Sequence, residues 1–251
     1  MTNALVQYAV SDGVATLILD SPHNRNALSR RLVSELFEGF DRAEADDDVR
    51  VVVLTASGSV FCSGADLAEA SDDGMEDGAR RIVDLQRRIV GSDKPVVARV
   101  QGAVRAGGTG VVAAADIAIC ADDVTFALTE VRLGLAAAVI SLTVLPRLTS
   151  RAAARTFLTG ETFDAGAAAA MGLVTTAVPQ EQLDDEVGRV VDDLRKGHPQ
   201  GLRESKRLVN AELLARIDES GADVADLSAR LFGSEDAREA MAAFLARRQE
   251  R

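Results

Sequence analysis

The chain has 251 residues and is 47% hydrophobic with only 8 Phe, 1 Tyr and no Trp, so we expect one large, aliphatic, Ala-rich core. Its net charge of -11 argues against nucleic acid as a general partner. The first residues lack the pattern of a signal peptide, and no apolar run of roughly 18 residues occurs. Cys62 and Cys120 favour free buried thiols, so we expect a cytoplasmic protein without a membrane span.

Strand and helix signals alternate through the first half of the chain. A strand-like run at 13–20 precedes a helical stripe at 27–45, for which Ser29 offers an N-cap. The pattern then predicts helices at 76–91 and 106–115, and strands at 50–55, 95–100, 117–120 and 124–127. A strand–strand–helix unit therefore repeats, which is typical of an α/β fold.

The second half is mainly helical. Asp164 is a candidate N-cap, Gly172 a candidate helix stop, and Pro179 a candidate start of a helix that runs to about residue 196. A last strand is expected at 174–178, and from residue 199 the pattern contains no strand signal. The sequence thus predicts a body at 1–198 and a helical C-terminal region at 199–251.

An apolar stripe runs along this C-terminal region: Leu202, Leu208, Leu213, Leu214, Val224, Leu227, Leu231, Phe244 and Leu245. Such a stripe must be buried. It either folds back onto the body of the same chain or packs against a neighbouring subunit. Because so long a stripe is hard to cover within one chain of this size, we expect the region to mediate self-association.

Two glycine-containing turns each follow a strand-like run. The first is Phe61–Leu67 (FCSGADL), and the second is Val100–Gly110 (VQGAVRAGGTG). Small residues after a strand allow backbone N–H groups to approach a ligand closely, and two converging N–H groups can form an oxyanion hole. The alternative is a packing turn in which small residues let a helix approach a strand. Neither turn matches a dinucleotide or P-loop fingerprint.

Glu130 lies in the segment TEVRLG, between an apolar strand and an apolar helix. A carboxylate at this position either forms an ion pair with a cationic side chain such as Arg132 or transfers a proton. Ser63 lacks the surroundings of a hydrolase nucleophile, since only His23 and His198 are available and no G-x-S-x-G elbow is present. No His and Cys cluster has the spacing of a metal site, so no metal is expected.

Taken together, these segments resemble the crotonase superfamily, the enoyl-CoA hydratase/isomerase family. The likeness includes FCSGADL, the GxxxAGG turn, Ala115–Ile117 (ADI) and Phe126–Leu135 (FALTEVRLGL), as well as the early His23–Leu28 (HNRNAL) and the final Ser234–Arg248 segments. The resemblance implies a spiral of ββα turns with a helical C-terminal region that builds homotrimers or dimers of trimers. It also implies acyl-CoA thioester substrates, with coenzyme A entering as part of the substrate and no separate cofactor.

The resemblance also implies roles for individual residues. Glu130 would be the catalytic acid–base group, and the backbone N–H groups of Ala65 and Gly107 would form the oxyanion hole. The CoA moiety would lie along five positions near the first turn: Arg25, Ala27, Ser63, Asp66 and Leu67. Arg247, where the family often has Lys, would reach a phosphate of a neighbouring subunit's CoA.

Several positions depart from the family pattern. Gly110 stands where two-glutamate hydratases carry their first glutamate, and Ala68 and Ala137 replace a basic residue and a proline that are common in the family. A single Glu suits enoyl-CoA isomerases and a group of bacterial hydratases, some of them acting on methylglutaconyl-type substrates. The segment 129–141 (TEVRLGLAAAVIS) favours the hydratases, so we expect 2-enoyl-CoA hydration. Isomerisation and a non-catalytic acyl-CoA-binding subunit are the alternatives.

Arg105 is an unusual residue two positions before Gly107, where the family usually has an apolar side chain. Its guanidinium either faces the acyl pocket and pairs with a substrate carboxylate, or points away into an ordinary surface ion pair. The first possibility would favour a carboxylated acyl group.

Overall fold

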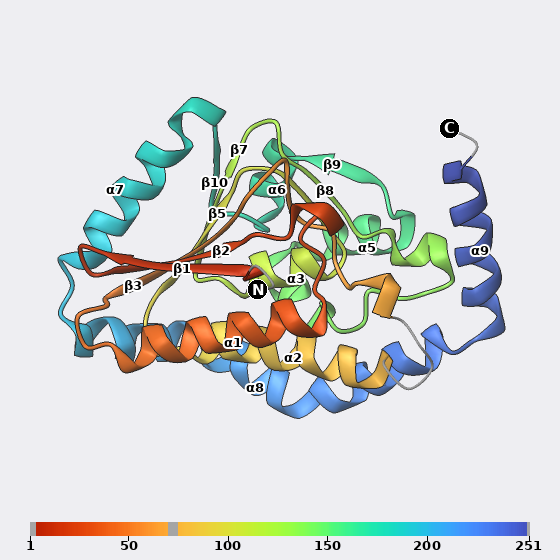
Figure 1. Cartoon of the computed structure of the whole chain (residues 1–251), viewed down its shortest axis with the longest axis horizontal. Helices are drawn as coiled ribbons and strands as arrows, with labels where there is room; N and C mark the ends of the chain where they lie inside the picture. The colour runs from red at the N-terminus through yellow and green to blue at the C-terminus, as the bar shows by residue number, and fades with distance from the viewer. Residues whose placement is uncertain (1–3, 70–74, 250–251) are drawn as a thin grey trace.

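The computed structural model describes residues 4–69 and 75–249, without the side chains of Leu67, Met75 and residues 244–249. The chain forms two sheets surrounded by helices, as Figure 1 shows. The larger sheet has the strand order β1 (Val6–Ser11), β2 (Val14–Leu19), β3 (Val51–Ala56), β5 (Val96–Val100), β7 (Ile117–Ala121) and β10 (Thr176–Val178). The smaller sheet has the order β4 (Val60–Cys62), β6 (Ala103–Arg105), β8 (Thr125–Ala127) and β9 (Thr162–Asp164).

The larger sheet is parallel from β2 to β10, and only β1 runs antiparallel, as the partner of β2. All six residues of β3 are buried, which agrees with the continuous apolar run expected for a strand covered on both faces. Strand β1 was not predicted from the sequence, although its signal was present. Asp12 and Gly13 both have positive φ and form the tight turn of the β1–β2 hairpin.

Helices cover both faces of the larger sheet. The helices of the body are α1 (Arg30–Ala45), α2 (Met75–Gly91), α3 (Gly107–Ala114), α4 (Ser141–Arg147), α5 (Ser150–Thr159), α6 (Ala165–Met171) and α7 (Leu183–Arg195). They are followed by α8 (Pro199–Phe232) and α9 (Glu235–Gln249). Figure 1 shows α1, α2 and α8 below the larger sheet and α7 on its other side. None of the described helices combines the length and apolar character needed to cross a membrane.

Most of the predicted helix boundaries agree with the structure. Ser29 caps α1 by accepting a hydrogen bond from the Leu32 N–H, so α1 begins at Arg30 and not at residue 27. Asp164 caps α6 in the same way, and Gly172 ends α6 in the left-handed conformation. Pro179 does not start a helix directly: a 3₁₀ turn, η4 (Gln180–Gln182), lies between it and α7.

Helix α8 packs along α2 of the same chain, which covers the C-terminal apolar stripe in part. Leu213 is buried, whereas Leu208 is 80% exposed and the neighbouring Val209 is 74% exposed. The other described stripe residues on α8 (Leu202, Leu214, Val224, Leu227 and Leu231) are half-buried, so the expectation that one chain does not fully cover this stripe stays a prediction. Phe244 and Leu245 belong to the side chains that lie outside the described part.

A buried polar cluster fixes α8 to the body. The Lys206 ammonium on α8 donates to the carbonyls of Ile89 and Lys94 and lies 2.8 Å from Asp116 Oδ2. The Asn210 amide donates to the other carboxylate oxygen of Asp116. Because the Ile89 carbonyl belongs to the last turn of α2, the ammonium also satisfies a helix end that would otherwise lack partners.

Candidate active site

The smaller sheet brings three separate segments to one place. Strands β4, β6 and β8 are parallel neighbours, so their carboxyl ends lie at the same edge of the sheet. The first glycine turn follows β4, the second follows β6, and the 3₁₀ turn η3 (Thr129–Leu133) with Glu130 follows β8. This parallel arrangement explains why segments some 65 residues apart (from Ala65 to Glu130) meet at one cavity.

The two glycine turns touch each other. A β-carbon on Gly64 would lie 3.1 Å from the Gly107 backbone nitrogen, and a β-carbon on Gly107 would lie 3.5 Å from the Ala65 nitrogen. Within the described part of the chain, neither of these two N–H groups donates a hydrogen bond to the protein. Gly107 is also the first residue of α3, so the positive end of that helix faces the same point. The arrangement can stabilise an oxyanion.

Backbone strain is concentrated beside this point. Ala106, directly before Gly107, has φ +47° and ψ -123°, a region that favours glycine. Arg25 and Asn26, in the segment that faces the first turn, have φ +59° and +54°. Strained residues of this kind cost about 1–3 kcal/mol each and persist where the surroundings fix them. Such strain is frequent at functional sites.

Hydrogen bonds hold the early segment 24–28 against the first glycine turn. Ser63 N–H donates to the Arg25 carbonyl, and Leu28 N–H donates to the Gly64 carbonyl at 2.8 Å. The fully buried Asn26 side chain accepts from the Ser21 N–H and donates to the carbonyls at the β3–β4 connection. The early sequence segment is therefore part of the site, as the family resemblance implied.

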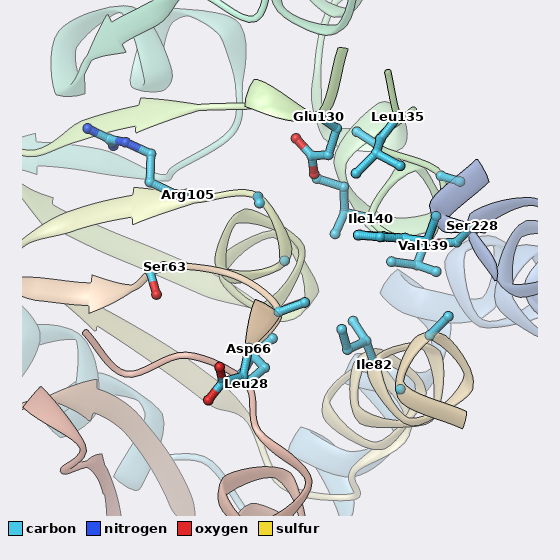
Figure 2. Close-up of a pocket in the computed structure, with 18 of the residues that line it drawn as sticks. Leu28, Ser63, Asp66, Ile82, Arg105, Glu130, Leu135, Val139, Ile140 and Ser228 are labelled. Atoms are coloured by element: carbon cyan, nitrogen blue, oxygen red, sulfur yellow. The ribbon is translucent and has the colours of Figure 1, made fainter. Parts of the chain in front are cut away.

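Glu130 enters the cavity from the side opposite the first glycine turn, and Figure 2 shows its carboxyl group directed into the open space. Its Oε2 atom is buried and has no hydrogen-bond partner among the described residues. Burial raises the pKa of Glu130 to about 7, although a hydrogen bond from its own backbone N–H opposes the shift. A carboxyl group with this pKa can both accept and return a proton near neutral pH.

The cavity has a volume of about 430 Å³. Arg25, Ser63, Ala65, Asp66, Gly107 and Glu130, all singled out from the sequence, line it. Its remaining wall is mostly apolar and comes from the segment before α1, from α2, the loop before α4, and α8: Leu28, Ile82, Leu135, Val139, Ile140, Ser228 and Phe232. The charged residues Arg30, Glu69, Arg81 and Arg105 also line it. The sequence offered no signal for Ser228, because the wall forms only when α8 packs against α2.

Four other residues fall outside this cavity or outside the described side chains. Ala27 is buried but does not line the cavity, and the Ala68 side chain is exposed while its N–H donates to Asp66. Leu67 begins the 3₁₀ turn η2 (Leu67–Glu69), and Arg247 lies on α9, but both side chains are outside the described part. Among the described residues, no three His, Cys, Asp or Glu side chains are placed to hold a metal ion.

Arg105 is among the residues that line the cavity, but its guanidinium is held by the neighbouring strands. It donates to the carbonyls of Val104 and Thr125 and to the Thr125 hydroxyl, and Figure 2 shows it directed away from Glu130. Its contacts are hydrogen bonds to neighbouring strands, so the guanidinium points away as one alternative from the sequence expects, but without the expected surface ion pair within the described part of the chain. This arrangement does not support pairing of Arg105 with a substrate carboxylate.

The position of the missing second glutamate is filled by other side chains. A β-carbon on Gly110 would lie 2.6 Å from Ile140 Cγ2 and 3.1 Å from Gln86 Oε1. Gln86 is fully buried, donates to the Val139 carbonyl, and accepts from the Thr143 hydroxyl at 2.6 Å. This network fixes Ile140 over Gly110, so no second carboxylate fits at that position without rearrangement.

Comparison with known proteins agrees with this geometry. The family model for enoyl-CoA hydratase/isomerase matches residues 9–251, and the chain belongs to this family. An enoyl-CoA hydratase from Mycobacterium avium is 50% identical, with a TM-score of 0.93 and 98% of each chain covered. The hydroxycinnamoyl-CoA hydratase-lyase of Pseudomonas fluorescens is 32% identical over 213 residues, which cover 80% of this chain and 76% of that protein.

A more distant neighbour supports the fold alone. A methylmalonyl-CoA decarboxylase is 22% identical, with a TM-score of 0.85 and with 98% of this chain and 97% of the other covered. The crotonase fold predicted from the sequence is thereby confirmed. The family processes acyl-CoA thioesters, which defines the general class of chemistry for this chain.

Proposed function

We propose that this protein is a hydratase that adds water across the 2,3-double bond of a 2-enoyl-CoA thioester. The observation that carries the proposal is the unpartnered Oε2 of Glu130 in the same cavity as the free N–H groups of Ala65 and Gly107. Hydration needs a proton carrier and a site for a developing enolate oxygen, and these groups supply both.

In the proposed reaction, ionised Glu130 takes a proton from water as the water oxygen bonds to C3 of the substrate. The electron pair of the double bond moves toward the thioester carbonyl, whose oxygen becomes an enolate held by the N–H groups of Ala65 and Gly107. Glu130 then returns the proton to C2. One group can perform both transfers because its pKa of about 7 leaves both protonation states populated at neutral pH.

The CoA moiety is proposed to lie along Arg25, Ala27, Ser63, Asp66 and Leu67, with Arg247 reaching a phosphate in a neighbouring subunit. Three of these residues, Arg25, Ser63 and Asp66, line the cavity that holds Glu130, which supports the assignment. No cofactor besides the CoA of the substrate is proposed. A homotrimer or a dimer of trimers is proposed as the assembly.

The acyl group is proposed to be uncharged next to the reacting carbons. Leu28, Ile82, Leu135 and Ile140 form an apolar wall there, and the Arg105 guanidinium is engaged with Thr125. A methylglutaconyl-type substrate would need a different partner for its carboxylate. A simple and a carboxylated 2-enoyl-CoA, compared for wild-type protein and Arg105→Leu, test this point: we expect the simple ester to be preferred and both kcat/KM values to change by the same factor.

Isomerisation of a 3-enoyl-CoA to a 2-enoyl-CoA is a second candidate. It is favoured by Ile140, which fills the space of a second carboxylate, since moving one proton between two carbons needs only one carrier. The proposal of hydration depends on Glu130 performing both transfers.

Parallel assays with crotonyl-CoA and a 3-enoyl-CoA, with Glu130→Gln as the matched control, separate the candidates. Hydration of crotonyl-CoA that is lost in the variant supports the hydratase. Turnover of the 3-enoyl ester alone supports the isomerase. Tight binding without turnover of either ester would mean a non-catalytic acyl-CoA-binding protein.

A further inference from the structure

The turn that carries Glu130 has little freedom of its own. The 3₁₀ turn η3 ends at Gly134, which adopts the left-handed conformation with φ +69°. The N–H groups of Gly134 and Leu135 both donate to the Glu130 carbonyl, the second at 3.0 Å. The backbone of Glu130 is therefore fixed by the residues directly after it.

Helix α9 presses against this turn. A β-carbon on Gly134 would lie 3.2 Å from the Cα and backbone N of Ala237 and equally close to the carbonyl carbon of Asp236. Ala237 is fully buried, in the first turn of α9. Figure 1 shows α9 at one edge of the molecule, and its main contacts within the described part are with η3 and α8. The helix thus docks onto the body chiefly at the catalytic turn.

The start of α9 is itself anchored, so it cannot move aside easily. Ser234 caps the helix: its hydroxyl accepts from the Ala237 N–H at 3.2 Å and donates to the Leu231 carbonyl at 2.7 Å. Leu231 belongs to the last turn of α8, and the nearby Ala225 and Ser228 of this helix are buried against the body. The backbone of α9 therefore forms a firm surface behind Gly134.

The opposite side of the turn is also in close contact. Gly160, at the end of α5, has φ +60°, and a β-carbon there would lie 3.0 Å from Val131 Cγ1 and 3.1 Å from the Leu128 carbonyl. Arg132 Nε donates to the Thr159 carbonyl at 3.4 Å. The turn is thus confined between the end of α5 and the start of α9.

The carboxylate of Glu130 depends on this confinement, because its Oε2 has no partner of its own. We propose that Gly134 and Ala237 are positioning residues: the first turn of α9 packs against Gly134 and thereby fixes the position of the Glu130 carboxylate. The inference rests on the proposed function only in taking Glu130 as the proton carrier. The charged residues near this contact are Arg132 on the turn itself, the α9 residues Glu235, Asp236, Arg238 and Glu239, and, on and beside α5, Arg151 and the Arg155–Glu161 pair.

The first experiment compares Gly134→Ala with Gly58→Ala. Gly58 also has a left-handed φ, +77°, but a β-carbon there would meet only Pro22 at 3.6 Å, so this variant carries the same backbone strain without crowding. We expect Gly58→Ala to lose the part of Tm that comes from backbone strain, and Gly134→Ala to lose somewhat more because its β-carbon is also crowded. Only Gly134→Ala should lower kcat, by about 10-fold or more with KM within about 3-fold, because a displacement of about 1 Å at a catalytic group costs up to about 10²-fold.

The second experiment approaches the contact from α9, with Ala237→Val and the exposed Ala242→Val of the same helix as its control. The pKa of Glu130 is followed by NMR in protein labelled with ¹³C at the Glu carboxyl carbon, and the signal is identified by its absence in Glu130→Gln. Displacement of the turn admits water, so the pKa should fall from about 7 toward the ordinary carboxyl value in Ala237→Val and Gly134→Ala but not in the controls.

The results separate this inference from the proposed function. If no enoyl-CoA ester is turned over, the proposed reaction fails while the NMR titration still tests positioning. An unchanged Glu130 titration in both Gly134→Ala and Ala237→Val, or equal loss of kcat in Gly134→Ala and Gly58→Ala, overturns the positioning role.

Discussion

Ile140 occupies the space next to Gly110: a β-carbon on Gly110 would lie 2.6 Å from Ile140 Cγ2, closer than real β-carbons approach. A longer side chain at this position would therefore meet Ile140. Gln86 and Thr143 hold the loop that carries Ile140 in place. A glutamate at position 110 would therefore also require a smaller or displaced side chain at position 140.

This packing predicts the outcome of Gly110→Glu. The single variant should lose about 3 kcal/mol or more of unfolding free energy, because it overpacks the contact and buries a charge without a partner. Adding Ile140→Ala should recover at least half of that loss. Chemical denaturation of both variants measures the effect, and equal instability of the single and double variants would contradict Ile140 as the obstacle.

Glu130→Gln is expected to abolish turnover and to stabilise the protein above neutral pH. The pKa of Glu130 is raised to about 7 in the folded protein, so its favourable contribution is complete below the ordinary carboxyl pKa and is lost as the pH rises through 7. At pH 8 the variant should therefore gain about 2–3 kcal/mol of unfolding free energy, and at pH 4 almost none. Urea denaturation of the wild-type protein and of Glu130→Gln at both pH values measures this difference in unfolding free energy. A pH-independent difference would mean that Glu130 is not buried as the structure has it.

Gly107→Val should depress kcat much more than stability. A β-carbon at this position would stand 3.5 Å from the Ala65 nitrogen and 3.2 Å from Leu28, within the space where the oxyanion is proposed to bind. Loss of one oxyanion donor typically costs about 10²–10³ in rate. Gly188→Ala on α7 is the control, since no atom lies within 4 Å of its new carbon. Parallel loss of Tm and kcat would instead favour a packing role for the turn.

Lys206→Met should destabilise the protein by about 3–5 kcal/mol, because it leaves the Asp116 carboxylate buried opposite an apolar side chain. The two side chains are only 4% and 15% exposed. Arg207→Met is the matched control: Arg207 pairs with Asp93 at the surface, and its loss should leave Tm unchanged within error. Thermal melts of both variants check the difference, and similar melts would mean that the Lys206–Asp116 pair does not secure α8.

The exposed face of α8 is expected to take part in self-association. Leu208 and Val209 are large apolar residues that stay exposed although α8 packs along α2. Light scattering should give a mass of three or six chains, and a Leu208→Glu, Val209→Glu variant should be smaller but folded. Deletion from Pro199 onward should give insoluble protein, because α2 loses its cover. A full-length monomer at micromolar concentration would contradict the expected assembly.

Local chemistry allowed much of this structure to be predicted. Ser29, Asp164 and Gly172 mark helix ends through their own hydrogen bonds or left-handed φ, which depend on few distant residues. The buried parallel strands were evident as continuous Val-rich runs. The short strands of the smaller sheet were harder to predict from the sequence. Strands β4, β6 and β9 have three residues each, so their conformation depends on pairing with neighbouring strands.

The parts of the candidate site that depend on local backbone geometry could be predicted from the sequence. The parts that depend on tertiary packing could not. Ala65, Gly107 and Glu130 follow strands in a recognisable order, so the sequence could indicate their meeting point. The direction of the Arg105 side chain depends on acceptors at Thr125, 20 residues away, which no local pattern reveals. Ser228 and Phe232 reach the cavity only through the docking of α8.

The hydrogen bond from Lys206 to the Ile89 carbonyl joins residues 117 positions apart in the sequence. The same helix α8 also contributes Phe232 to the cavity wall. A cavity assembled from both ends of a chain cannot exist while the C-terminal helices are still being synthesised. Folding of the α2–α8 pair is a late, long-range event, and long-range contacts of this kind form slowly. A nascent chain would thus expose the apolar face of α2 until its last helices leave the ribosome, which makes this interval the time of greatest aggregation risk.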